Sequence, residues 1–340
     1  MKLFDPLDIN GLLIKNRIIM APMCTHFDMT SDRAQSYYQK RADGGVGLII
    51  TESICVNKFS DNVFIDKLRR FVENIHLYNT KLFIQLVLSD DIPGSAKKLA
   101  PYSFGQYQQA SISDIELCYK QIINAALACK KIGCDGIEIH GAHGYFLAQF
   151  FSKRTNFRID KYGGCINNRM RFAIECVRNI RNNIEESFII SYRFSADEFM
   201  PNGVTIEESQ QLAFELQNAG INILHVSAGI GTDGEYRVTP NANQPLGVFS
   251  DLANSIKKVV RIPVISVGRI HTPEVAEDIL VHDKSDFVAI GRALIADPNW
   301  VRKVATNNSA SINRCIACNN CIMKISRGDE LTCKVNNNLF

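Results

Sequence analysis

The chain has 340 residues, of which 46% are hydrophobic and 21% are charged, and it contains only 10 prolines. This composition is typical of a globular protein with a large core and excludes a low-complexity chain. The net charge of +3, without any run of Lys or Arg, argues against nucleic acid or a membrane surface as a partner. The length alone permits one large domain or two ordinary ones.

Residues 1–6 contain no apolar segment of the kind that a secretory signal needs, and no apolar stretch approaches the roughly 20 residues that span a bilayer. We therefore expect a cytoplasmic protein whose 11 cysteines are reduced thiols. Seven of the cysteines are scattered along the chain. The other four crowd a C-terminal segment at about 312–340 and are Cys315, Cys318, Cys321 and Cys333.

Short apolar, β-branched runs alternate with segments of helical period along most of the chain. The runs are continuously apolar rather than alternating. This pattern is typical of the strands of a parallel sheet that helices cover. The predicted strands are 17–21, 48–51, 82–86, 136–140, 189–194, 223–226, 263–267 and 287–290.

Five predicted helices lie between these strands, and each opens on a polar capping residue, Ser113 in the first of them. The helices are 113–131, 168–184, 205–219, 250–260 and 272–281. Gly133 and Gly220 follow two of them, where a left-handed residue commonly ends a helix. Eight strand–helix units predict an α/β fold with one (β/α)8 (TIM) barrel over residues 1–340. An open doubly wound sheet is disfavoured because no Gly-rich dinucleotide turn follows the first strand.

The last two predicted strands each run into a Gly-Arg pair. In barrels of this type a phosphate site often follows strands seven and eight. Glycine lets backbone N–H groups approach a phosphate, and arginine offers a planar fork of donors. Turn glycines with surface arginines are the alternative reading. The two pairs are Gly268-Arg269 and Gly291-Arg292.

The fourth strand ends in His140, His143 and Tyr145, a set of donors that can hold an oxyanion and deliver a proton. The His-x-x-His spacing also suits a metal, but no carboxylate or cysteine accompanies it closely, and structural histidines are a third alternative. An arginine inside a barrel strand is costly unless it is paired or faces an anion. Other strand ends carry Cys24, Gln85 and Arg193.

Several segments match one family in series along essentially the whole chain. They are 3–7 (LFDPL), 15–18 (KNRI), 21–23 (APM), 140–145 (HGAHGY), 156–164 (NFRIDKYGG), 291–293 (GRA) and 297–298 (DP). The chain therefore resembles the Old Yellow Enzyme, or NADH:flavin oxidoreductase, family.

This resemblance implies that the chain binds FMN. Arg193 would face the N1/O2 edge, where the reduced flavin carries negative charge, and Gln85 would bond to the pyrimidine edge. Cys24 would lie beside the flavin and tune its potential, or else serve as a small buried hydrophobe. The residues that would hold FMN are Ala21, Pro22, Met23, Cys24, Ser53, Gln85, Arg193, Gly268, Arg269, Gly291 and Arg292.

The resemblance also implies a reaction. NADH or NADPH would reduce FMN, and an α,β-unsaturated carbonyl compound, such as an enone or enal, would then accept the hydride. His140 and His143 would hydrogen-bond the carbonyl oxygen, and Tyr145 would protonate the α-carbon. The alternatives are an electron-transfer subunit that works with a partner reductase, a redox sensor or flavin store, and a non-flavin barrel lyase or metal hydrolase. A homo-oligomer stays open.

The sequence departs from the family pattern at two places that would border the substrate. The family commonly continues the third strand with a histidine, a glycine and an arginine that are missing after Gln85, and the loop to Gln109 also matches poorly. Substrate preference therefore cannot be inherited. His26 stands where the thiol branch often has tyrosine, as a substitute donor or an altered rim.

The C-terminal cysteines resemble the [4Fe–4S] site of the 2,4-dienoyl-CoA reductase branch, although that branch usually has one more residue before its third cysteine. Zinc and metal-free thiols are the alternatives. In those relatives an appended FAD and NADPH domain supplies electrons. Because this chain ends at Phe340, we expect that domain to be absent and any such donor to be another polypeptide.

Overall fold

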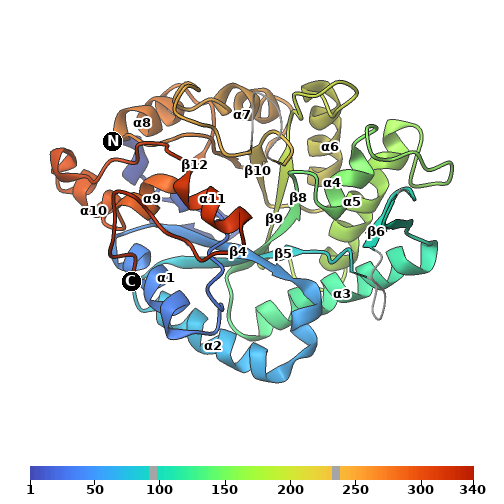
Figure 1. Ribbon diagram of the computed structural model, residues 1–340, viewed down its shortest axis with the longest axis horizontal. Coiled ribbons are helices and arrows are strands. Elements are labelled where there is room, and N and C mark those ends of the chain that lie inside the picture. Colours follow the sequence, from blue (N-terminus) through green and yellow to red (C-terminus); the bar gives the residue numbers. More distant parts are fainter. Residues whose placement is uncertain (92–97, 104, 232–237) are drawn as a thin grey trace.

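The computed structural model describes residues 1–91, 98–103, 105–231 and 238–340. Eight parallel strands close into a barrel in the order β10-β11-β12-β3-β4-β5-β8-β9 (Figure 1). This confirms the predicted (β/α)8 barrel. The strands are β3 (Ile18–Met20), β4 (Leu48–Cys55), β5 (Lys81–Val87), β8 (Gly136–Gly141), β9 (Ile189–Ser195), β10 (Ile223–Ser227), β11 (Val264–Ser266) and β12 (Phe287–Ile290).

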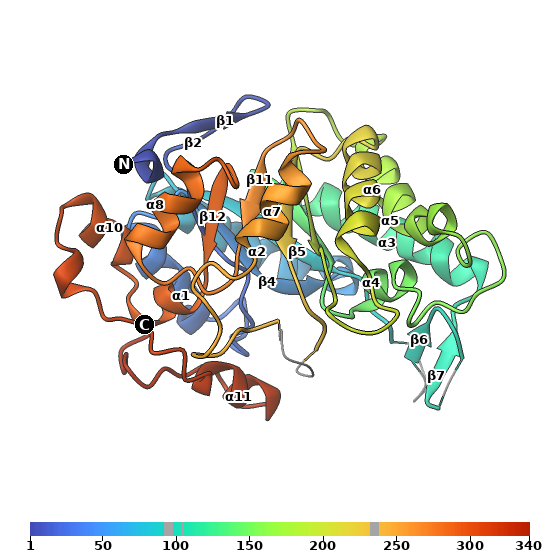
Figure 2. The ribbon, with the colours of Figure 1, turned by 90° about the horizontal axis from the view of Figure 1, so that it is seen from above.

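Helices surround the barrel and pack their apolar faces on the outer faces of the strands (Figures 1 and 2). The longer helices are α1 (Asp32–Asp43), α2 (Asn62–His76), α3 (Ile112–Lys131), α5 (Ile166–Arg181), α6 (Ile206–Asn218), α7 (Ser250–Lys257) and α8 (Pro273–Val281). The shorter ones are α4 (Phe146–Phe151), α9 (Arg292–Ala296), α10 (Trp300–Ala305) and α11 (Asn320–Ser326). A small parallel pair, β6 (Lys98–Ala100) and β7 (Tyr107–Gln109), lies outside the barrel. Of the helices in the described ranges, none is long and apolar enough to cross a membrane.

The helix starts correct some predicted caps. Helix α3 is capped by Ser111 and not by Ser113: the Ser111 hydroxyl accepts from the Asp114 N–H, and the Asp114 carboxylate accepts from the Ser111 N–H. This reciprocal arrangement satisfies two donors that the helix leaves open. Thr205 and Glu208 form the same box on α6, whereas α5 and α7 begin without a side-chain cap. The predicted left-handed residues have φ of +90° and +103° at Gly133 and Gly220.

The barrel interior has an apolar floor. Side chains from all sides of the barrel, such as Ile19, Phe83 and Ile189, form one buried cluster near the strand starts. The antiparallel hairpin of β1 (Leu7–Ile9) and β2 (Leu12–Ile14) packs Ile9 and Ile14 into this cluster. Figure 2 shows the hairpin at one end of the barrel and α11 at the other. In the described residues the end at which the strands begin is therefore filled, and a ligand would enter from the end at which the strands finish.

The C-terminal segment, residues 312–340, lies over the loops at that open end. The Leu331 N–H donates to the Thr25 carbonyl at 2.9 Å, which ties the segment to the loop after β3. The Arg41 guanidinium, fully buried on α1, donates to the Leu339 carbonyl at 3.1 Å. The segment is therefore joined to the barrel at several points and is part of the same rim.

Candidate active site

Above the apolar floor, the barrel interior becomes polar. Glu138 of β8 is completely buried and stands in register between Gln85 of β5 and Ser191 of β9. Its carboxylate accepts hydrogen bonds from Gln85 Nε2 at 2.8 Å, from Ser191 Oγ at 3.0 Å and from His225 Nδ1 at 2.9 Å. Burial alone would raise the pKa of Glu138, but the charge of His225, the hydrogen bond from His225 and the charge of Arg193 outweigh burial and lower the pKa. Glu138 is therefore an ionised acceptor.

Arg193 lies in the next layer, in register between His140 and His225. Its side chain is almost wholly buried, and it forms no hydrogen bond or ion pair with any part of the chain that the structure describes; its Nε is buried without a partner. Burial lowers the pKa of Arg193, but a guanidinium stays protonated in proteins. Since unpartnered buried donors are costly, this cation predicts an anionic group on the open side of the barrel.

The structure brings His140, His143 and Tyr145 close together. The ring of His140 lies 5.3 Å from that of His143 and 4.7 Å from that of Tyr145, centroid to centroid. The Nδ1 of His140 accepts from the Ala142 N–H at 3.3 Å, and burial lowers the pKa of His140 to about 3. The ring is therefore neutral, with its proton on Nε2.

His143 and Tyr145 differ in how free their polar atoms are. His143 Nε2 lies 2.8 Å from Ser227 Oγ, and burial lowers the pKa of His143 well below its ordinary value. Tyr145 is 52% exposed at the start of α4, and partial burial raises the pKa of its phenol. Tyr145 is thus a protonated phenol open to the space in which a substrate would lie.

The loop after β3 is fixed by Glu52 of β4. The Glu52 carboxylate accepts from the Thr25 N–H at 2.7 Å and from Thr25 Oγ1 at 2.6 Å. Cys24 lies beside it and is exposed, so it is not the small buried hydrophobe of the alternative. Partial burial of the thiol together with the Glu52 charge raises the pKa of Cys24 to about 11. Cys24 is therefore a thiol and not a thiolate at neutral pH. Ser53 is exposed at the same end of the barrel, in register with Gln85.

The two Gly-Arg pairs have different surroundings. Gly268 has φ of +118°, and a Cβ there would lie 2.6 Å from the Phe249 ring, so only glycine fits. The Nε of Arg269 is buried and finds no partner in the described ranges. Arg292, however, donates to Asn319 Oδ1, which turns its side chain toward the cysteine segment. For a phosphate at this turn the structure therefore offers the Arg269 side chain, with Gly291 and Arg292 contributing through the backbone.

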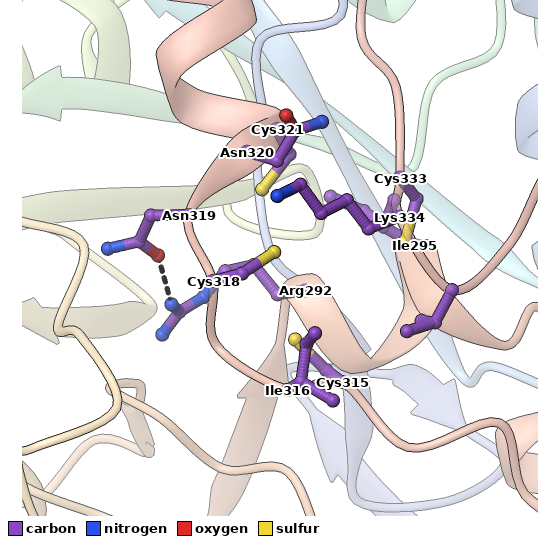
Figure 3. A pocket seen from close by; sticks show the side chains of 11 residues that line it. Arg292, Ile295, Cys315, Ile316, Cys318, Asn319, Asn320, Cys321, Cys333 and Lys334 are labelled. Atoms are coloured by element: carbon purple, nitrogen blue, oxygen red, sulfur yellow. Dashed lines mark hydrogen bonds between the residues drawn. The ribbon is translucent and has the colours of Figure 1, made fainter.

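The C-terminal cysteines line one pocket (Figure 3). Cys315, Cys318, Cys321 and Cys333 face it, and Arg292 forms part of its wall. Within the residues that the structure describes, no three Cys, His, Asp or Glu side chains converge on a single-ion position. Four thiols are the ligand type of a [4Fe–4S] cluster, whereas one zinc ion needs all its sulfurs at about 2.3 Å.

Several site residues were not found in the sequence. Glu138 and His225 interrupt apolar strands, and Glu138 lies two residues before His140 on the same face of β8; this alternation was the available signal. Thr25 and Glu52 carried no such signal. His26 Nδ1 lies 2.8 Å from the Asp329 carbonyl, so His26 holds the C-terminal segment. Of the divergent loop after Gln85, residues 92–97 and 104 lie outside the described residues.

These residues fit a flavin mononucleotide. The unpartnered Arg193 suits the electron-rich edge of an isoalloxazine, Gln85 lies one layer below with Glu138, and the turn at Gly268 and Arg269 provides donors for a phosphate. A sequence model of the NADH:flavin oxidoreductase / NADH oxidase family matches residues 2–310. The chain belongs to this family. FMN is its flavin, which confirms the predicted family and cofactor.

Comparison with individual proteins agrees. The chain is 40% identical to an NADH oxidase of Thermoanaerobacter brockii, over 98% of this chain and 56% of that protein. It is 30% identical to a cinnamate reductase of Clostridium sporogenes, over 98% and 57%. An NADPH dehydrogenase of a Geobacillus species is 31% identical over 91% of this chain and 96% of its own length. The chain thus spans about half the length of the first two relatives.

Solved structures give the same fold. Histamine dehydrogenase from Rhizobium sp. 4-9 superposes with a TM-score of 0.89 at 27% identity, covering 98% of this chain and 52% of that one. An Old Yellow Enzyme homologue from Zymomonas mobilis superposes with a TM-score of 0.75 at 23% identity, covering 90% and 93%. These likenesses place the chain on the barrel fold of the family.

Proposed function

We propose that this chain is an FMN-dependent NAD(P)H oxidoreductase that reduces the C=C bond of α,β-unsaturated carbonyl compounds. The observation that carries the proposal is the pairing of a neutral His140, whose Nε2 proton is free, with the exposed phenol of Tyr145. Bound FMN supplies hydride transfer, which no side chain can perform. The residues of the chain supply binding, orientation and a proton.

The carbonyl oxygen of the substrate needs a hydrogen-bond donor, because negative charge develops on it as hydride arrives at the β-carbon. His140 Nε2–H provides that donor, and the low pKa of His140 keeps this tautomer neutral across physiological pH. His143 can donate through Nδ1 when Ser227 donates to its Nε2. In this proposal the two histidines act together on one oxygen.

Tyr145 is the proton donor for the α-carbon. Burial raises the pKa of its phenol, so the proton stays in place until a strongly basic carbon forms beside it. The cinnamate reductase among the relatives supports this choice of substrate, because cinnamate has a C=C bond conjugated to a carboxylate. The phenolate left behind is reprotonated from solvent, to which Tyr145 is open.

The test is Tyr145→Phe, measured in stopped flow as two half-reactions. Flavin reduction by NAD(P)H should be unchanged, whereas flavin reoxidation by 2-cyclohexenone should slow about 100-fold or more, since a positioned acid contributes about that much. Tyr78→Phe is the control, because Tyr78 precedes β5 at the closed end of the barrel. Equal reoxidation rates in both variants would remove Tyr145 from the mechanism.

A second candidate is an electron-transfer subunit that receives electrons through the C-terminal cysteines. It is favoured by the Leu331–Thr25 bond, which joins the cysteine segment to the loop that carries Cys24. The isolated chain decides between the two functions. Rapid anaerobic flavin reduction by NADH or NADPH alone supports the ene-reductase, and reduction only in the presence of a partner reductase supports the subunit.

A further inference from the structure

The buried carboxylate of Glu138 has no part in the steps described so far. It lies below the reacting groups, 0% exposed, and receives three hydrogen bonds from three different strands. A carboxylate is expensive to bury and could be replaced by an apolar side chain if it served packing alone. Its position between Gln85 and the layer of Arg193 suggests what it does instead.

The first consequence concerns Gln85. An amide has two ends, and the Gln85 Nε2 is occupied by Glu138 at 2.8 Å. An ionised carboxylate accepts only, so it selects the NH2 end of Gln85 and leaves the carbonyl oxygen for other partners. That oxygen is the acceptor that the N3–H of an isoalloxazine requires. Glu138 thereby decides which end of Gln85 a flavin encounters.

The second consequence concerns charge. Arg193 is a buried cation without an ion pair to the described chain, and the negative charge of Glu138 lies one layer beneath it. His225 donates its Nδ1 proton to Glu138, and burial lowers the pKa of His225. A ligand at the open end of the barrel therefore meets the positive charge of Arg193, which the negative charge of Glu138 partly offsets.

We propose that Glu138 is a positioning residue that presents the Gln85 carbonyl to the flavin and limits the positive field of Arg193, so that it sets the reduction potential of bound FMN. The inference rests on the flavin-binding role proposed above. If Glu138 has this role, residues inside the barrel, and not only those at its rim, influence the cofactor.

The experiment compares Glu138→Gln with wild type and with Ser191→Ala, a control that removes one donor and leaves the charge and the Gln85 bond intact. FMN binding to apoprotein is titrated by fluorescence in the oxidised and the reduced state. Loss of the negative charge should favour reduced FMN, raising its affinity relative to oxidised FMN about tenfold, a positive shift of about 30 mV for two electrons. Ser191→Ala should leave this ratio within about threefold of wild type.

A role in packing alone would weaken both binding steps equally, so an unchanged ratio in Glu138→Gln overturns the inference. If wild type still binds FMN, that result leaves the proposed function standing. If Glu138→Gln does not fold, Glu138→Asp carries the test. It keeps the charge but draws the carboxylate away from Gln85, so oxidised FMN should bind about tenfold more weakly with the ratio preserved. Unchanged affinity in Glu138→Asp likewise overturns the inference, and failure of wild type to bind FMN would defeat the proposed function itself.

Discussion

Replacing Thr25 by valine should loosen the loop that follows β3. Valine keeps the branched shape of threonine and removes only the hydroxyl. That hydroxyl donates to Glu52 Oε1 at 2.6 Å and accepts from the Phe27 N–H at 3.1 Å, and all three residues involved are buried. The backbone bond from the Thr25 N–H to Glu52 at 2.7 Å survives the change. The variant therefore isolates two side-chain hydrogen bonds.

The magnitude follows from these two bonds. A hydrogen bond to a charged group contributes about 1.5–3 kcal/mol, and a buried N–H left without a partner costs about 1 kcal/mol or more. Thr25→Val should therefore lower the free energy of unfolding by about 3 kcal/mol. Thr30→Val is a matched control on the same loop, because Thr30 Oγ1 bonds Asp28 at 2.8 Å in an exposed position. It should cost no more than about 0.5 kcal/mol.

Urea unfolding of the apoprotein, followed by far-UV circular dichroism, measures both values. FMN titration of the same samples adds a functional readout, because residues 21–24 are expected to line the flavin. Thr25→Val should bind FMN more weakly and Thr30→Val should bind it normally. Equal unfolding free energies in the two variants would refute the account of how Glu52 holds this loop.

Three other outcomes follow from the site. Arg193→Met should weaken FMN binding about tenfold and lower the midpoint potential of the bound flavin in a dye-equilibrium titration, since the reduced flavin loses its cation; an unaltered potential would contradict this role. The pKa of His140 is about 3 in the folded state and about 6.5 when unfolded, so unfolding takes up a proton between these values and stability falls as pH drops below 6.5. In His140→Asn the free energy of unfolding, read from urea midpoints at pH 4–6, should depend less steeply on pH, by the uptake of about one proton. An identical pH dependence would show that His140 is not the titrating group. Cys333→Ser should reduce the iron content of anaerobically purified protein, whereas Cys165→Ser, a scattered exposed thiol, should not; equal iron in both would argue against a cluster.

The sequence predicted the barrel well because its strands are short runs of buried β-branched residues, whose pattern does not depend on distant partners. The predicted strand 223–226 is β10 but for one residue, and 48–51 is the first half of β4, which continues past an irregularity between Ile50 and Ser53. Helix α3 was assigned the wrong serine. The reciprocal signal was Asp114, three residues after Ser111.

The candidate site was predicted at its rim more than at its base. His140, His143 and Tyr145 follow one strand, so their proximity needs no tertiary information. The bond between Glu138 and His225 joins residues 87 positions apart, and only the register across β8, β9 and β10 brings them together. Likewise, the two Gly-Arg pairs are alike in sequence, and only the contact with Asn319 shows that Arg292 faces the cysteine pocket.

The hydrogen bond between Leu331 and Thr25 has a thermodynamic consequence. It makes the last stretch of the chain and the first loop of the barrel a single ordered unit, with Cys333 at one side and Cys24 at the other. A ligand that orders the cysteine segment also orders the loop, so flavin binding then costs less conformational entropy. By thermodynamic linkage, flavin binding favours that ligand to the same extent. Ligand binding at the cysteine segment and flavin binding at the loop after β3 should therefore be coupled, so that binding at one raises the affinity at the other.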